Sequence, residues 1–136
     1  MIRYLDSIIC IDCLRDKTPV FRRELQKLLP SQVKIPSMVK AELLHGALRS
    51  ANPSRNQELV MQLLAPFEVV SFDDAAAREY TSIRLQLEQV GAIIGFNDLV
   101  IAATVKSLGG ILVTNSIKEF NRVEGLFLES WAEVSL

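Results

Sequence analysis

The sequence predicts a single α/β domain over residues 1–136, with a mainly parallel central sheet flanked by helices in three layers. Short apolar runs alternate along the chain with longer amphipathic stretches, which is typical of parallel strands joined by crossover helices. No internal repeat, low-complexity tract or Ser/Gly linker divides the 136 residues, so one domain is expected. Hydrophobic residues make up 49% and charged residues 23%, values that exclude intrinsic disorder.

Five short apolar runs are expected to form the strands of this sheet. They cover residues 2–5, 33–35, 67–72, 111–114 and 126–128. Pro36 is expected to end the second run, because proline has no amide hydrogen to donate to a neighbouring strand.

The amphipathic stretches between these runs are expected to form helices. The clearest covers residues 75–90, where apolar side chains recur every three or four residues at Ala76, Tyr80, Ile83, Leu87 and Val90. Asp73 or Asp74 can cap the start of this helix, and Gly91 can end it.

Four further helices are expected, and two of them carry acidic residues that are candidates for a functional site. One begins at Ser37, a good capping residue, and contains Glu42; another runs from residues 97–98, with Asp98, to Gly109 and Gly110. The centre of the latter is apolar on nearly all sides, which predicts that it is buried against the sheet. The remaining two are expected over residues 22–29 and 55–64, each ended by a proline.

Composition restricts the environment and the partners of the chain. Lys and Arg number 15 and Asp and Glu 16, for a net charge of -1, so direct DNA binding through bulk positive charge is not expected. No apolar run approaches the roughly 20 residues of a membrane span, and the first residues do not resemble a signal peptide. A cytoplasmic protein without membrane contact is expected, in which Cys10 and Cys13 are reduced.

Four acidic residues fall where a parallel sheet places its functional crevice, outside the carboxyl ends of the strands. Asp6 directly follows the first strand, and Glu42 lies in the helix after the second. Asp98 opens the helix that leads to the fourth strand, and Glu119 opens the helix after it. The sequence therefore predicts that four carboxylates meet at one edge of the sheet.

Such a cluster indicates a particular chemistry. Each pair of carboxylates at ~4–5 Å repels by roughly 3–4 kcal/mol at an effective dielectric constant of 20, and either protonation or a bound cation relieves the repulsion. Oxygen ligands without paired His or Cys suit Mg²⁺ or Mn²⁺. Such an ion can clamp a phosphate and acidify a bound water, which favours phosphodiester hydrolysis.

Four segments carry a resemblance to a known family. They are Tyr-Leu-Asp-Ser at 4–7, Ala-Glu-Leu-Leu-His-Gly-Ala at 41–47, Ile-Gly-Phe-Asn-Asp-Leu-Val-Ile-Ala-Ala at 94–103, and the stretch 112–126 that begins Leu-Val-Thr-Asn-Ser. These segments occur in this order over nearly the whole chain, and Trp131 follows them. Together they resemble the PIN-domain ribonucleases of the VapBC toxin type.

The resemblance implies a PIN-like fold and a metal-dependent endoribonuclease toxin of a type II toxin–antitoxin pair. It implies that Asp6, Glu42 and Asp98 hold Mg²⁺ or Mn²⁺, and that Glu119 is an auxiliary catalytic acid. It also implies RNA as the substrate, a cognate antitoxin protein as a partner, and a homodimer. DNA binding would then belong to the antitoxin.

The chain departs from the family pattern at two places. The family usually has Asp-Thr-Asn at the first acid, where this chain has Asp6, Ser7 and Ile8, and it has Asp or Asn where this chain has Ser116. Both changes remove polar groups that could orient the site, and such losses cost ~10–100-fold. The alternative function is therefore a catalytically weakened PIN-fold module that binds a partner protein or RNA without cleavage.

Several residues have a second interpretation. Ser116 and Glu119 have the spacing of a capping box, in which Glu119 would bond to the Ser116 amide instead of serving a metal site. Asp98 could cap its helix, which is compatible with metal binding. Cys10 and Cys13 form a CxxC pattern that could serve redox chemistry or zinc, but two small apolar residues that share one helical face fit it better.

Basic residues could contact RNA phosphates or could form a solvated surface. A cluster lies near the start of the chain at Arg15, Lys17, Arg22 and Arg23. Arg84 lies on the predicted long helix near the acidic edge, and Trp131 is expected to pack at the end of the domain.

Overall fold

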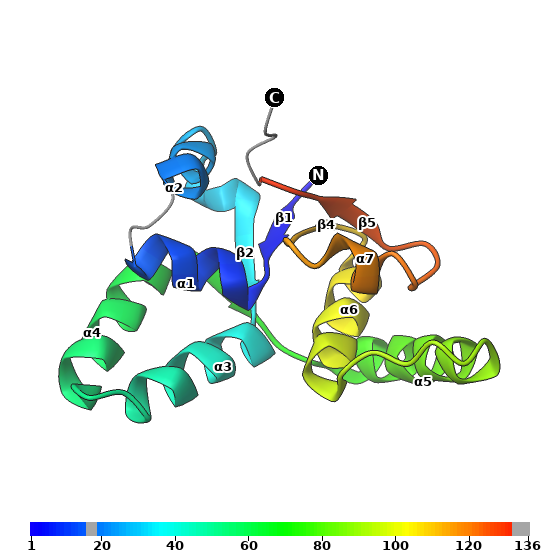
Figure 1. Cartoon of the computed structure of the whole chain (residues 1–136). Coiled ribbons are helices and arrows are strands. Elements are labelled where there is room, and N and C mark those ends of the chain that lie inside the picture. Colours follow the sequence, from blue (N-terminus) through cyan, green and yellow to red (C-terminus); the bar gives the residue numbers. More distant parts are fainter. Residues whose placement is uncertain (16–18, 132–136) are drawn as a thin grey trace.

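The computed structural model describes residues 1–15 and 19–131, and its centre is a five-stranded parallel sheet (Figure 1). The strands are β1 (Arg3–Leu5), β2 (Val33–Pro36), β3 (Glu68–Val70), β4 (Ile111–Val113) and β5 (Phe127–Glu129). Their order is β3-β2-β1-β4-β5, and every neighbouring pair is parallel. The predicted fold class is confirmed, with strands at all five predicted places.

Seven α-helices within the described ranges flank the sheet. They are α1 (Ser7–Arg15), α2 (Pro19–Gln26), α3 (Ser37–Leu48), α4 (Pro53–Leu64), α5 (Asp74–Gln89), α6 (Phe96–Leu108) and α7 (Ile117–Phe120), with a short 3₁₀ helix, η1 (Pro30–Gln32), before β2. In Figure 1, α1 to α4 lie to one side of the strands and α5 to α7 to the other. In the sheet, β2 and β3 lie on one side of β1, and β4 and β5 lie on the other side. Because crossovers between parallel strands are right-handed, the helices α1 to α4 and the helices α5 to α7 cover opposite faces of the sheet.

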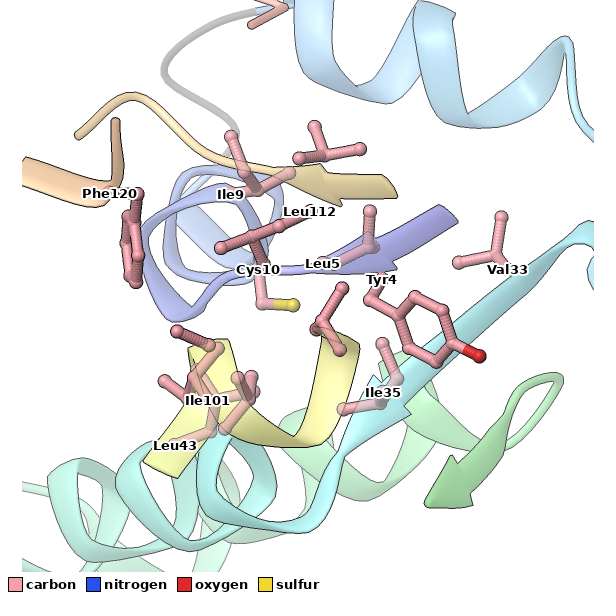
Figure 2. Packing of buried hydrophobic residues seen from close by; sticks show 14 of the residues in the cluster. Tyr4, Leu5, Ile9, Cys10, Val33, Ile35, Leu43, Ile101, Leu112 and Phe120 are labelled. Carbon is pink, nitrogen blue, oxygen red and sulfur yellow. The ribbon is translucent and has the colours of Figure 1, made fainter. Parts of the chain in front are cut away.

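The core is built around the three central strands. Leu5, Ile35 and Leu112 point from β1, β2 and β4 into the cluster of apolar side chains shown in Figure 2, and each is at most 2% exposed. From the helices, Ile101 of α6 and Phe120 of α7 join this cluster with no exposed surface. The prediction that the apolar centre of α6 is buried is confirmed, and this burial anchors the start of α6 at one edge of the sheet.

The predicted ends of α5 are confirmed. The Asp73 side chain accepts a hydrogen bond of 3.0 Å from the amide of Ala76. Gly91 follows the helix with a φ of 65°, a left-handed conformation that glycine adopts without steric cost.

The predicted start of α3 at Ser37 is confirmed, but the cap predicted for it and the bounds predicted for α2 are wrong. Ser37 is not the cap of α3 but its first helical residue, because Pro36 occupies the capping position in an extended conformation at the end of β2. The helix predicted over residues 22–29 begins at Pro19 and ends at Gln26. A proline is favourable in the first turn of a helix, and Pro30 opens η1 instead of ending α2.

Trp131 packs at the end of the domain, as predicted. It is 6% exposed, and its indole nitrogen donates a hydrogen bond of 3.1 Å to Glu129 on β5. The same carboxylate accepts a bond of 2.7 Å from Arg3 of β1, which lowers the pKa of Glu129. Since β4 lies between β1 and β5, this ion pair spans three strands.

No helix in the described part of the chain combines the length and the apolar character that crossing a bilayer requires.

We predict that Gly110→Ala destabilises the fold. A Cβ atom at Gly110 would overlap the ring of Tyr4 and lie 2.8 Å from the carbonyl oxygen of Ile2. Tyr4 is 3% exposed and has no room to move, so the cost should be about 1–3 kcal/mol. Gly46→Ala is the matched control: nothing lies within 4 Å of its added Cβ, and alanine should stabilise α3 by about 0.5–1 kcal/mol. Urea unfolding of both variants measures the difference, and equal midpoints would contradict it.

Candidate active site

The carboxyl ends of β1 and β4 form the centre of the candidate site. The amide of Asp6 donates to the carbonyl of Val113 at 2.9 Å, which continues the ladder between the two strands beyond the end of β1. Asp6 and Thr114, each the first residue after its strand, are therefore held next to one another.

Asp6 is buried, and both of its carboxylate oxygens accept a hydrogen bond. Oδ1 accepts from the amide of Ser7 at 2.8 Å, and Oδ2 accepts from the hydroxyl of Thr114 at 2.7 Å. Burial raises the pKa of Asp6, and these two bonds oppose that effect by stabilising the charged form. The carboxylate is thus fixed in position by groups that also favour its ionisation.

Glu42 of α3 joins the site through Ser7. The Ser7 hydroxyl donates to Glu42 Oε1 at 2.9 Å, while the Ser7 amide donates to Asp6. Ser7 therefore connects two predicted acids that are 36 positions apart in the chain. Ser7 thus orients both carboxylates, Glu42 through its hydroxyl and Asp6 through its backbone amide.

Asp98 lies in the first turn of α6, and three other carboxylates act on it. Its pKa is raised to about 6 by burial first, then by the negative charges of Asp6, Glu119 and Glu42, and by hydrogen bonding with Glu119. The structure thus brings all four predicted carboxylates near one edge of the sheet. Their catalytic and metal-binding roles remain predictions.

The capping box predicted for Ser116 and Glu119 does not form. The Ser116 amide donates instead to the hydroxyl of Thr114 at 3.0 Å, and the Ser116 side chain makes no capping hydrogen bond in α7. This leaves the Glu119 side chain exposed, and its negative charge is among the causes that raise the pKa of Asp98. The capping box does not form because the Thr114 hydroxyl, just after β4, accepts the hydrogen bond of the Ser116 amide that the box needs.

Thr114 is the functional candidate that the sequence analysis missed. Its hydroxyl donates to Asp6 and accepts from Ser116, and the residue has no exposed surface. A buried threonine directly after an apolar strand, at the same sheet edge as an acid, was the available signal. It was assigned to the strand alone.

The four carboxylates give the site an excess of negative charge. Within residues 1–15 and 19–131, none of Asp6, Glu42, Asp98 and Glu119 pairs with a basic side chain. The same residues contain no group of three or more His, Cys, Asp or Glu close enough to hold a metal directly. The four acids thus interact electrostatically without forming a preassembled ligand cage.

A groove between α1, α3 and α4 opens beside this site. Its volume is 270 Å³, and Glu42 lies in its wall together with Arg15 and apolar residues such as Leu14, Leu43 and Leu59. The acidic site and the apolar groove therefore share one residue.

The two cysteines are buried on α1, and no disulfide joins them. Burial raises the pKa of Cys10 far above the range in which a thiolate forms. Of the open interpretations, the packing of small apolar residues fits the structure, and redox chemistry at Cys10 does not.

The predicted basic residues that the structure describes have different contacts. Arg22 donates a bond of 2.7 Å to the carbonyl of Cys13, Arg15 lines the groove, and Lys17 lies outside the described residues. Arg84 of α5 lies over the ring of Phe96 at the start of α6, with 5.3 Å from its guanidinium carbon to the ring centroid.

Comparisons with known proteins agree with this arrangement. The PIN domain family matches residues 3–126. The chain is 36% identical to the protein named Ribonuclease VapC2 of Rickettsia felis, over 96% of this chain and 98% of that one. It is 37% identical to the protein named tRNA(fMet)-specific endonuclease VapC of Shigella flexneri, over 94% of this chain and 96% of that one.

Solved structures extend the likeness to three dimensions. A complex named VapBC2 from Rickettsia felis, bound to a DNA fragment from its promoter, contains a chain with a TM-score of 0.91 and 35% identity, over 97% of this chain and 100% of that one. A DNA-bound VapBC from Salmonella typhimurium has a TM-score of 0.91 at 32% identity, over 97% of this chain and 99% of that one. With its parallel sheet and its carboxylates at the strand ends, the chain belongs to the VapC group of the PIN-domain family.

Proposed function

We propose that the chain is a metal-dependent endoribonuclease toxin of a type II toxin–antitoxin pair, hydrolysing RNA phosphodiester bonds with a carboxylate-held Mg²⁺ or Mn²⁺. The observation that carries the proposal is the convergence of four carboxylates without a compensating basic side chain among the described residues. Two relatives that match over nearly their whole length are named a ribonuclease and a tRNA(fMet)-specific endonuclease, which supports the reaction class.

The donor set fits a hard divalent cation. Asp6, Glu42 and Asp98 would hold the ion, and Glu119 would assist; all four supply oxygen, which Mg²⁺ and Mn²⁺ prefer. Mg²⁺ keeps several of its waters and needs only one or two protein carboxylates, so a preassembled cage is not required. When bound, the ion would neutralise charge on the phosphate and acidify a water.

The chain's own residues prepare this site. Hydrogen bonds from the Thr114 hydroxyl and the Ser7 amide fix Asp6 and favour its ionised form against the burial that raises its pKa, and the Ser7 hydroxyl orients Glu42. Asp98 can keep a proton up to about pH 6 while no cation is bound, because burial and the charges of Asp6, Glu119 and Glu42 raise its pKa to about 6. The protonation of Asp98 is therefore the part of the site that changes with pH.

The proposal includes a cognate antitoxin and a homodimer. The structural neighbours are VapBC complexes, some of them bound to DNA, which supports an antitoxin partner. The groove beside Glu42 offers apolar side chains next to the acidic site, so a protein that covers the groove could place a basic side chain against the carboxylates. DNA binding is assigned to that partner, because this chain has a net charge of -1.

We predict that Asp6→Asn and Asp98→Asn each reduce RNA cleavage at least about 100-fold, since each removes a charge that an ion would need. The fold should persist, because Asn keeps the size of Asp and Asp98 makes no capping hydrogen bond in α6. Glu58→Gln, on an exposed position of α4, is the control and should cleave like wild type. The measurement is cleavage of a structured RNA with Mg²⁺ or Mn²⁺, and with EDTA.

Cleavage by the purified protein that persists in EDTA would contradict metal dependence. Absence of cleavage in both metals would favour the alternative function, a PIN-fold module that binds RNA or a partner without turnover.

We predict a pH dependence from the raised pKa of Asp98. Its value of about 6 lies above the ordinary 3.8, so between these values the folded protein binds more protons than the unfolded chain. Stability from this group is therefore present at low pH and is lost as pH rises through about 6, where Asp98 ionises beside Asp6, Glu42 and Glu119. In EDTA, Asp98→Asn should have a higher Tm than wild type at pH 7, and the difference should shrink towards pH 4. An equal Tm at pH 7 would contradict this.

We predict that Ile8→Asn strengthens metal binding. Ile8 lies in the first turn of α1, two positions after Asp6, and is 38% exposed. An amide there restores a polar group of the kind whose loss costs ~10–100-fold, and removing an exposed isoleucine should leave the fold intact. Isothermal titration with Mn²⁺ should show tighter binding than in wild type, and no change in affinity would show that Ile8 does not weaken the site.

A further inference from the structure

An exposed aromatic ring lies beside the acidic site. Phe96 opens α6, two positions before Asp98, and is 63% exposed. Phe21 and Phe120, by contrast, are at most 3% exposed. An exposed phenylalanine gives up most of the free energy that its burial would contribute, so packing does not explain its presence at the start of this helix.

An arginine, Arg84, packs over the ring of Phe96. The guanidinium of Arg84 lies over its ring at 5.3 Å, a cation–π contact. The same guanidinium donates to the hydroxyl of Tyr80 at 3.2 Å and approaches Glu88 at 3.8 Å. The ring and the positive charge are thus presented together on the surface.

A second arginine adds positive charge near the ring. Arg122, just after α7, donates a bond of 3.2 Å to the carbonyl of Ile93, three positions before Phe96. One arginine therefore lies over the exposed ring and a second is bonded to the backbone three residues before it, next to a site with an excess of carboxylates. A ligand that is both anionic and aromatic fits this combination, and single-stranded nucleic acid is that ligand.

We propose that Phe96 stacks on an unpaired nucleobase of the RNA, and that Arg84 orients the ring and contacts the adjoining phosphate. Successive residues of a helix point 100° apart, so Phe96 and Asp98 face different directions. The stacked base therefore belongs to a nucleotide near the cleaved bond and not to the reacting phosphate. This inference rests on the proposed function, and it specifies single-stranded RNA as the form of the substrate bound at this subsite.

The first experiment measures binding in the Asp98→Asn protein, so that RNA is not consumed. A labelled single-stranded RNA of about 12 nucleotides is titrated with this protein and with versions that also carry Phe96→Ala or Phe127→Ala. Phe127 is the matched control: it is 58% exposed, but it pairs with Ile111 at the amino ends of the strands, opposite the site. Phe96→Ala should weaken binding about 5- to 100-fold, since stacking of one base is lost, and Phe127→Ala should not.

The charge of Arg84 is tested by salt dependence. Arg84→Gln should lower the slope of log affinity against log salt concentration by about 0.7, the value for one phosphate contact on a single strand. Phe96→Ala should weaken binding without changing this slope. An unchanged slope in Arg84→Gln would overturn the phosphate contact.

Stacking is observed directly with Phe96→Trp in the Asp98→Asn background. Trp131 is buried and bonded to Glu129, so RNA-dependent quenching reports on position 96. Quenching by the RNA, and much less by an abasic strand of the same length, supports the inference. Equal effects of the two strands would overturn it.

Activity separates this inference from the proposed function. In otherwise wild-type protein, Phe96→Ala should raise KM for single-stranded RNA more than it lowers kcat. If wild type cleaves RNA while Phe96→Ala keeps its affinity and KM, the subsite is overturned and the proposed function stands. If wild type does not cleave, the proposed function fails, whatever the fluorescence shows. Loss of dimerisation in Phe96→Ala with unchanged RNA affinity would assign the ring to a contact with a second copy, and would overturn the subsite.

Discussion

Repulsion among the carboxylates at the edge of the sheet is the constraint on which the rest of the site depends. Asp98 is the residue where this repulsion is visible, because its raised pKa results from burial together with the charges of Asp6, Glu42 and Glu119. A fold selected for stability alone would not gather these groups. Ser7 and Thr114 donate hydrogen bonds to Asp6 and Glu42, which stabilise these carboxylates without neutralising their charge.

The apolar core provides the rigidity that this arrangement needs. β1 is the central strand of the sheet, and its burial fixes the position of Asp6 at its end. α6 is buried through residues 101–105, so its first turn, with Asp98, cannot move away from the other charges. Strands of only three or four residues are sufficient because helices cover both faces of the sheet.

The same charge excess explains why cations near the site matter. An RNA backbone approaching four carboxylates is repelled unless positive charge accompanies it. A divalent ion can supply that charge at the reacting phosphate, and arginines such as Arg84 and Arg122 can supply it beside that phosphate. Phe96 adds contact area that does not depend on charge. The chain as a whole stays near neutrality, at a net charge of -1, so attraction for RNA has to be local.

The sequence alone determined the parallel α/β fold and the four acids, because both follow from local patterns: apolar runs separated by amphipathic stretches, and acidic residues placed just after strands or at helix starts. Only the tertiary structure decided the hydrogen bonds between these segments. Ser116 and Glu119 have the spacing of a capping box, but Thr114 takes the Ser116 amide, and Glu119 lies beside Asp98 instead. Phe96 and Arg84, 12 positions apart, meet only because α5 packs against α6. Glu119 and Asp98, like Arg84 and Phe96, come from different elements, and no periodicity within one segment can specify which group from another segment will lie beside a carboxylate or cover a ring.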